Sequence, residues 1–248
     1  MNNLEPMIIG GKKLVKILKN LKNLAKPGIN LLQIERKAWE LMQREGGNPS
    51  FLSVNGYSHA TCLNVNDGLV HGIPRDYILK EADLLNIDMG FFYKGYHTDL
   101  AQSLIVSYSP ENYPEKVKFL KAGINALNKA IRISFEGNFV GSISAKIQEN
   151  IEKSGFAAAS NYTGHGIGKN LHEAPLIPCI LNSNINATPP LKSGMTLAIE
   201  VIYMMGRSNT IIESDNWTVR TADRSLAACF EKTIVVGKRN PLILTDWD

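Results

Sequence analysis

The feature that most constrains how this chain folds is a pair of aspartates inside two otherwise apolar segments. Segments 84–92 and 98–106 are rich in β-branched and large apolar side chains, as strands are. Lys94 and Gly95, which lie between them, are typical of a two-residue hairpin turn. The sequence therefore predicts an antiparallel hairpin that carries both carboxylates.

If those two residues form the loop, Asp88 faces Ala101 and Asp99 faces Gly90, so the two aspartates are diagonal neighbours on one face, roughly 7 to 8 Å apart. A loop one residue earlier would put them directly opposite each other, still on the same face. Two converging carboxylates repel each other, and burying either one unpaired costs several kcal/mol or forces it to take up a proton. A bound cation removes both penalties. The alternative is a hairpin whose aspartates face water, and the rest of the chain must decide between the two.

Helical patterns occur on both sides of the hairpin. Residues 8–26 and 113–134 repeat apolar side chains at three- and four-residue steps, as amphipathic helices do. Asn30 followed by Gln33 forms a capping-box pattern for a further helix that ends near Glu45. The apolar positions of that helix and its flanking glycines recur 109 residues later, where Gly137 and Gly155 correspond to Gly28 and Gly46.

The order of helix, helix and strands thus occurs twice, which predicts an α+β fold made of two similar halves. We expect a single domain over residues 1–248, with halves of about 1–108 and 109–248 whose strands share one sheet covered by helices.

Composition excludes several other classes. A net charge of +4 is too weakly basic to favour DNA or RNA as the main partner. Cys62, Cys179 and Cys229 are odd in number and form no CxxC pair, so neither a disulfide framework nor a structural zinc site is indicated. The first residues lack a leader pattern, and no apolar run is long enough to cross a membrane. We expect a cytoplasmic monomer without membrane contact.

Two more acids interrupt apolar strand patterns in the second half, Glu200 within residues 195–203 and Glu231 within residues 229–236. His165 lies in a glycine-rich segment, where the backbone can approach closely. The full set is four carboxylates and one imidazole: Asp88, Asp99, His165, Glu200 and Glu231. Such an oxygen-rich set suits two divalent ions about 3.5 to 4 Å apart, which predicts metal-assisted hydrolysis.

The motifs around these residues follow one another in a characteristic order. They are Asp-x10-Asp, Gly-His-Gly-Ile-Gly at 164–168, Ile-Glu at 199–200 and Phe-Glu-Lys-Thr-Ile-Val-Val at 230–236. This order resembles the pita-bread metallopeptidases. Segments 65–74 and 217–225 make the chain similar to their type I methionine aminopeptidases, in the short bacterial form.

The resemblance implies a pita-bread fold, in which two pseudo-symmetric halves share a curved, mostly antiparallel sheet covered by two pairs of helices. It implies removal of the initiator methionine from nascent polypeptides with a small second residue, by attack of a metal-bridging hydroxide on the peptide carbonyl. Two divalent ions, cobalt, manganese, iron(II) or zinc, are the implied cofactors.

The resemblance also assigns the ligands. Asp88 and Asp99 would bind one ion, and Asp99, His165 and Glu200 the other. Glu231 would bridge both ions, and Glu200 would in addition carry a proton.

His71 and His172 correspond to the family histidines that contact the substrate at the scissile amide, although either can instead be a histidine satisfied within a loop. The residues expected to line the methionine pocket are Phe51, Tyr57, Cys62, Leu171 and Trp217, for which plain core packing is the alternative. Six residues depart from the family pattern: Phe51, Val54, Leu171, Val201, Cys229 and Lys232.

Two other functions stay open at this point. One is a Xaa-Pro aminopeptidase or prolidase-like enzyme, because residues 171–175 also resemble that branch. The other is a non-catalytic paralogue that docks on ribosomes. The helix at 8–26 carries a lysine-rich face that is either solvated or in transient ribosome contact.

Overall fold

The predicted hairpin is present in the computed structural model with the predicted register. Strands β4 (Leu84–Tyr93) and β5 (Tyr96–Ile105) pair so that Asp88 lies opposite Ala101 and Asp99 opposite Gly90. Lys94 and Gly95 have positive φ angles of 48° and 86°, as the tight turn requires. Hairpin and turn are therefore confirmed.

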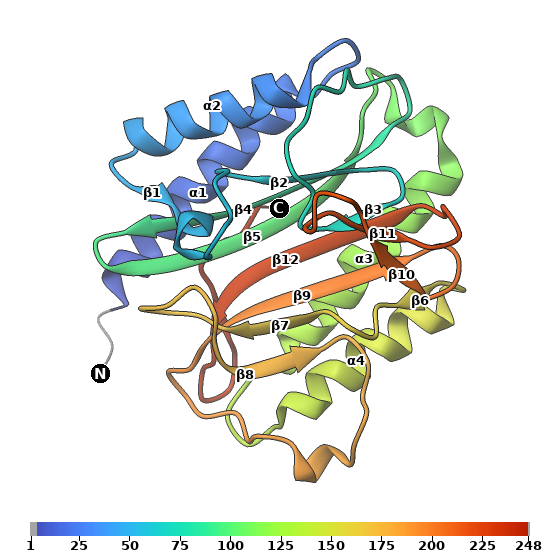
Figure 1. Cartoon of the computed structure of the whole chain (residues 1–248). Coiled ribbons are helices and arrows are strands. Elements are labelled where there is room, and N and C mark those ends of the chain that lie inside the picture. The colour runs from blue at the N-terminus through green and yellow to red at the C-terminus, as the bar shows by residue number, and fades with distance from the viewer. Residues whose placement is uncertain (1–3, 248) are drawn as a thin grey trace.

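This hairpin belongs to a ten-stranded antiparallel sheet, whose main path is β1-β4-β5-β12-β9-β7-β8 (Figure 1). The structure describes residues 4–247, so the first three residues of the segment examined for a leader lie outside it. The other strands of the sheet are β1 (Asn48–Pro49), β2 (Cys62–Val65), β6 (Ala157–Ala158), β7 (Thr163–Gly166), β8 (Glu173–Pro178), β9 (Thr196–Met204), β12 (Ala227–Val235) and β13 (Leu242–Ile243). A smaller sheet contains β3 (Gly68–Val70), β10 (Thr210–Ile212) and β11 (Val219–Thr221).

Four α-helices lie in the described residues: α1 (Glu5–Leu24), α2 (Leu31–Arg44), α3 (Pro114–Arg132) and α4 (Val140–Lys153). Short 3-10 turns are η1 (Ser50–Ser53), η2 (Pro110–Asn112) and η3 (Ile185–Ala187). Helix α1 packs on β4 and β5, and α3 packs on β9 and β12, so the two helix pairs cover the two halves of one sheet (Figure 1). The structure thus has the α+β pita-bread architecture.

The helix boundaries follow local chemistry. The side chain of Asn30 accepts from the backbone of α2 and Gln33 bonds back to Asn30, so the capping box is confirmed. Helix α1 begins at Glu5, three residues before the predicted start. Pro6 is tolerated there because the N–H groups of the first helical turn have no partner within the helix, and an N–H is the one group that proline lacks. None of these helices, over residues 4–247, has an apolar stretch long enough to cross a bilayer.

Gly123 in α3 shows how tightly the second helix pair packs. A Cβ at this position would lie 2.6 Å from side-chain atoms of both Tyr203 and Phe230. We expect Gly123→Ala to lower the free energy of unfolding by about 1 to 3 kcal/mol through overpacking. Urea denaturation measures this. Gly10→Ala in α1 is the matched control, because its nearest neighbour would lie at 3.4 Å. A stabilised Gly123→Ala variant would contradict the packing.

Candidate metal centre

Cross-strand register brings three of the predicted ligands into one row across four strands. Asp88 pairs with Ala101, Ala101 with Glu231, and Glu231 with Glu200. Residues directly opposite each other point to the same face of a sheet. Three carboxylates therefore project from one face, and the small side chain of Ala101 leaves room between them.

A second row completes the set. Asp99 lies two residues from Ala101 along β5, on the same face. His165 pairs with Ala198, which lies two residues before Glu200 on β9. The strand period of two thus places all five predicted ligands on one patch of the sheet.

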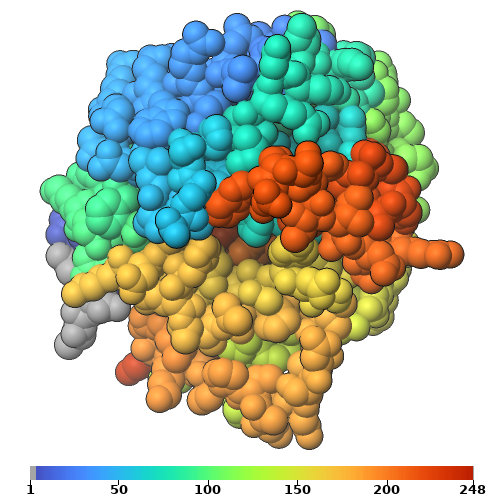
Figure 2. Space-filling view, viewed as in Figure 1, coloured from blue at the N-terminus to red at the C-terminus, as the bar shows by residue number. Residues whose placement is uncertain are grey.

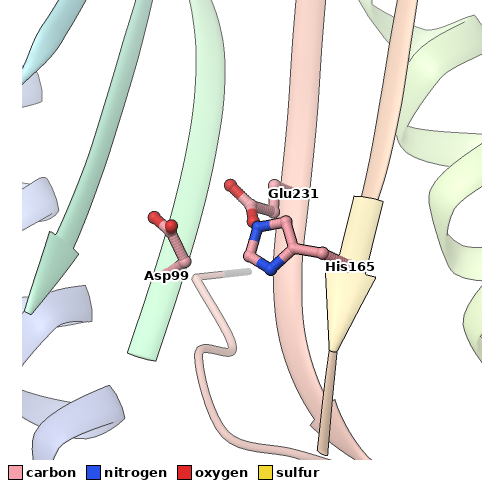
Figure 3. Close-up of side chains that lie close together, drawn as sticks. All are labelled: Asp99, His165 and Glu231. Atoms are coloured by element: carbon pink, nitrogen blue, oxygen red, sulfur yellow. The ribbon is translucent and has the colours of Figure 1, made fainter. Parts of the chain in front are cut away.

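Figure 3 shows three of these side chains, Asp99, His165 and Glu231, lying close together between their strands. Ligand atoms of Asp99, His165 and Glu231 all lie within 4.8 Å of one another. Nε2 of His165 is 3.6 Å from Oε1 of Glu200. Asp88 lines the same cavity as these four residues.

The tautomer of His165 is set by its backbone contact. Its Nδ1 lies 2.9 Å from the carbonyl oxygen of Gly166, which only accepts, so Nδ1 carries the hydrogen. Burial lowers the pKa of His165 to about 4, which keeps the ring neutral. Nε2 therefore presents a lone pair toward the carboxylates, as a metal-ligating histidine does.

The carboxylates are held in an environment that disfavours their charge. Burial raises the pKa of Asp88 to about 7 and raises the pKa of Glu200 well above its usual range. Burial and the neighbouring acids raise the pKa values of Asp99 and Glu231 in the same direction. Oε1 of Glu231 is buried without a hydrogen-bond partner among the described residues. These oxygens and the His165 lone pair fit a divalent cation, which supplies the missing partner and the positive charge.

A cavity of about 180 Å³ opens beside this group. Its lining outside the five ligands is Phe51, Val54, Tyr57, Cys62, Val70, His71, His172 and Trp217. Figure 2 shows a hollow at the centre of this face, where blue, yellow and orange parts of the chain meet. Six predicted substrate-binding residues thus line one cavity. The seventh, Leu171, is buried in the apolar cluster that contains Phe51, Tyr57 and Cys62.

The two predicted substrate histidines come from separate segments and lie at the rim, where both are exposed. His71 directly follows β3 and has a φ of 58°, which turns the chain back at the cavity. The ring centroid of His172 lies 4.5 Å from that of His165. Each histidine therefore lies beside the carboxylates but comes from outside the strand positions that carry them.

Other residues of the site have no clear sequence signal. Val70 enters the lining only because β3 pairs with β11, where Val70 lies opposite Val219. His97 shares a strand face with Asp99, yet its Nδ1 lies 2.9 Å from Oγ of Ser50 and its ring packs on Phe92. His97 therefore holds the η1 segment, from which Phe51 reaches the cavity.

The profile of Metallopeptidase family M24 matches residues 7–238. The chain belongs to this family. This metallopeptidase is 37% identical over 228 residues to a methionine aminopeptidase of Aquifex aeolicus, covering 89% of this chain and 87% of the relative.

Solved structures of two kinds of peptidase share its fold. A methionine aminopeptidase of Thermotoga maritima is 34% identical with a TM-score of 0.92, covering 98% of this chain and 96% of that one. A prolidase of Pyrococcus furiosus is 20% identical with a TM-score of 0.79, covering 99% of this chain and 64% of that one, and shares the fold alone.

The raised carboxyl pKa values predict how the stability of the metal-free protein depends on pH. A folded carboxyl with a raised pKa keeps a proton that the unfolded chain has lost, so stability falls as pH rises through that pKa. His165 and His97 act in the opposite sense, but only between about pH 4 and 6.5. We expect the free energy of unfolding to fall from pH 6.5 to about pH 8, as measured by urea denaturation.

The matched variant is Asp99→Asn, which keeps the shape of the side chain but removes one of the mutually repelling charges. Its free energy of unfolding should fall less steeply over the same pH range. A wild-type protein whose stability is flat or rises there would show that the acids are not held protonated.

Proposed function

We propose that this metallopeptidase removes an N-terminal methionine from nascent polypeptides whose second residue is small. The observation that carries the proposal is an apolar cavity that ends on the group of four carboxylates and His165. The similarity to methionine aminopeptidases over most of both chains supports it. We take residues 1–248 as a single catalytic domain with two related halves.

The cavity wall suits a linear thioether side chain. Oη of Tyr57 donates to the carbonyl of Thr61 at 2.8 Å and lies 3.2 Å from Sγ of Cys62, so the polar groups of the wall are occupied within the wall itself. The Tyr57 ring meets the Phe51 and Trp217 rings edge to face, with centroids 6.0 and 5.0 Å apart. This rigid aromatic and thiol surface offers contacts of the kind that methionine sulfur favours.

We assign Asp88 and Asp99 as the residues that would hold one divalent ion, and Asp99, His165 and Glu200 as those that would hold a second, with Glu231 available to both. Cobalt, manganese, iron(II) and zinc all accept such oxygen and nitrogen ligands. When bound, the ions polarise the substrate carbonyl and activate a water molecule.

The protein's own groups bind the substrate and move protons. Glu200, next to His165, is the group that accepts a proton from the attacking water and passes it to the leaving amine. His71 and His172 stand at the rim, where their ring N–H groups donate to the scissile amide and to the oxyanion that develops from it. Burial lowers the pKa of His172, so the ring works as a neutral donor.

We place the enzyme in the cytoplasm as a monomer that acts on nascent chains. Lys12, Lys16 and Lys19 are exposed on α1 and supply a basic face for transient ribosome contact. No contact with membrane or DNA is part of the proposal.

The test is hydrolysis of Met-Ala-Ser and Ala-Pro-Ala peptides by metal-free protein refilled with Mn²⁺, Co²⁺, Fe²⁺ or Zn²⁺ in turn. We expect methionine release from the first peptide only, and none without metal. Release of alanine from Ala-Pro-Ala alone would assign the chain to the proline-specific branch. No release with any ion, from protein that binds none, would favour a non-catalytic role.

His71→Ala tests the role of the rim. We expect kcat to fall by roughly two to four orders of magnitude, because one transition-state contact is lost, while metal content stays at the wild-type level. Steady-state kinetics and metal analysis measure both. His59→Ala is the control, since His59 lies near Glu35 outside the cavity lining. Loss of metal in His71→Ala would make His71 a ligand instead.

A further inference from the structure

The strand β12 changes its partner beside the metal centre. Glu231 and Lys232 pair with Ala101 and Leu100 of β5, but Ile234 and Val235 pair with β13 instead. Thr233 is the point of change: the backbone N–H of Leu244 donates to its carbonyl oxygen at 2.8 Å. The segment Leu244–Trp247 therefore enters between β12 and β5, where Figure 3 shows a thin coil next to Asp99.

At this point, hydrogen bonds of threonine hydroxyls replace the backbone-to-backbone hydrogen bonds between β5 and β12. Oγ1 of Thr233 accepts from the backbone N–H of Asp99 at 2.9 Å and donates to the carbonyl of Asp99 at 2.7 Å. Oγ1 of Thr245 accepts from the N–H of Thr233 at 2.7 Å and lies 3.3 Å from the same Asp99 carbonyl. Thr245 is fully buried, so water does not replace these bonds. The backbone of Asp99 is thus tied to β12 through two hydroxyl groups.

The same segment reaches Glu231. Nε1 of Trp247 donates to the carbonyl oxygen of Glu231 at 2.9 Å. The segment is anchored by Lys232, which is fully buried: its Nζ lies 2.7 Å from Oδ1 of Asp246 and 4.2 Å from the centre of the Trp247 ring. A buried ammonium needs such partners, so the anchor holds the segment in one place.

We propose that Leu244–Trp247 is a positioning element of the metal centre, in which Thr245 and Trp247 fix the backbones of Asp99 and Glu231. The inference rests on the proposed function, because it requires these two carboxylates to bind metal. Groups that orient metal ligands from behind typically change metal affinity when they are removed. Neither Thr245 nor Trp247 is among the residues that line the cavity, so they act only through the two ligands.

The test measures Mn²⁺ affinity by calorimetry and the visible absorption spectrum of the Co²⁺-loaded protein. We expect Thr245→Val, which keeps the shape and removes the hydroxyl, to weaken Mn²⁺ binding roughly 10- to 100-fold and to alter the Co²⁺ spectrum. Thr245→Ser should restore both. Trp247→Phe keeps a ring over Lys232 but removes the N–H, and should weaken Mn²⁺ binding in the same way.

Thr188→Val is the matched control. Its hydroxyl also accepts from one backbone N–H, that of Gly141 at 2.8 Å, and donates to one carbonyl, that of Ile185, but this bridge joins η3 to the start of α4. We expect its urea midpoint to fall while Mn²⁺ affinity stays at the wild-type level.

The outcomes separate the two proposals. Wild-type affinity in both Thr245→Val and Trp247→Phe, with wild-type protein that binds Mn²⁺, would overturn the positioning role alone. Equal weakening in Thr188→Val would also overturn it, because general loss of stability would then explain the effect. Wild-type protein that binds no divalent ion would overturn the proposed function and this inference with it.

Discussion

Repulsion among buried carboxylates is the interaction on which the rest of this structure depends. Asp88, Glu231 and Glu200 lie in one row across the sheet, with Asp99 beside them, and burial raises the pKa of each. Four such groups in one apolar setting are tolerated only if they hold protons or share cations. The neutral ring of His165, with its lone pair toward them, favours cations. The four acids therefore lower the stability of the metal-free protein, but they also provide strong ligands for cations.

The sheet accommodates the four acids because its register and its small side chains leave space between them. Ala101 and Ala198 occupy the positions between the ligands, where a large side chain would fill the space needed by an ion. Where β5 and β12 part, Thr233 and Thr245 replace the backbone ladder with hydroxyl bridges. The opening between the strands and the fixation of Asp99 are thus two results of one local change in pairing.

The cavity depends on a different level of structure. Its aromatic wall comes from residues 51–62, its histidine rim from residues 71 and 172, and its outer edge from Trp217. The small sheet places two of these residues, because β3 pairs with β11 and so brings His71 and Trp217 to one side of the opening. Substrate contacts therefore come from both sheets: Cys62 pairs with Asp88 in the ten-stranded sheet, whereas His71 and Trp217 flank strands of the small one.

The sequence by itself determined what is local. The Lys94-Gly95 turn set the register of Asp88 and Asp99, and the Asn30 and Gln33 pair set the start of α2, because both depend on residues only a few positions apart. Acids within apolar strand patterns also gave the ligand types. Only the tertiary structure decided that Glu231 faces Glu200, that Val70 joins the lining and that Thr245 and Trp247 hold the ligand backbones. Those contacts join residues far apart in the chain, and their register follows from packing of the whole sheet, which no local pattern specifies.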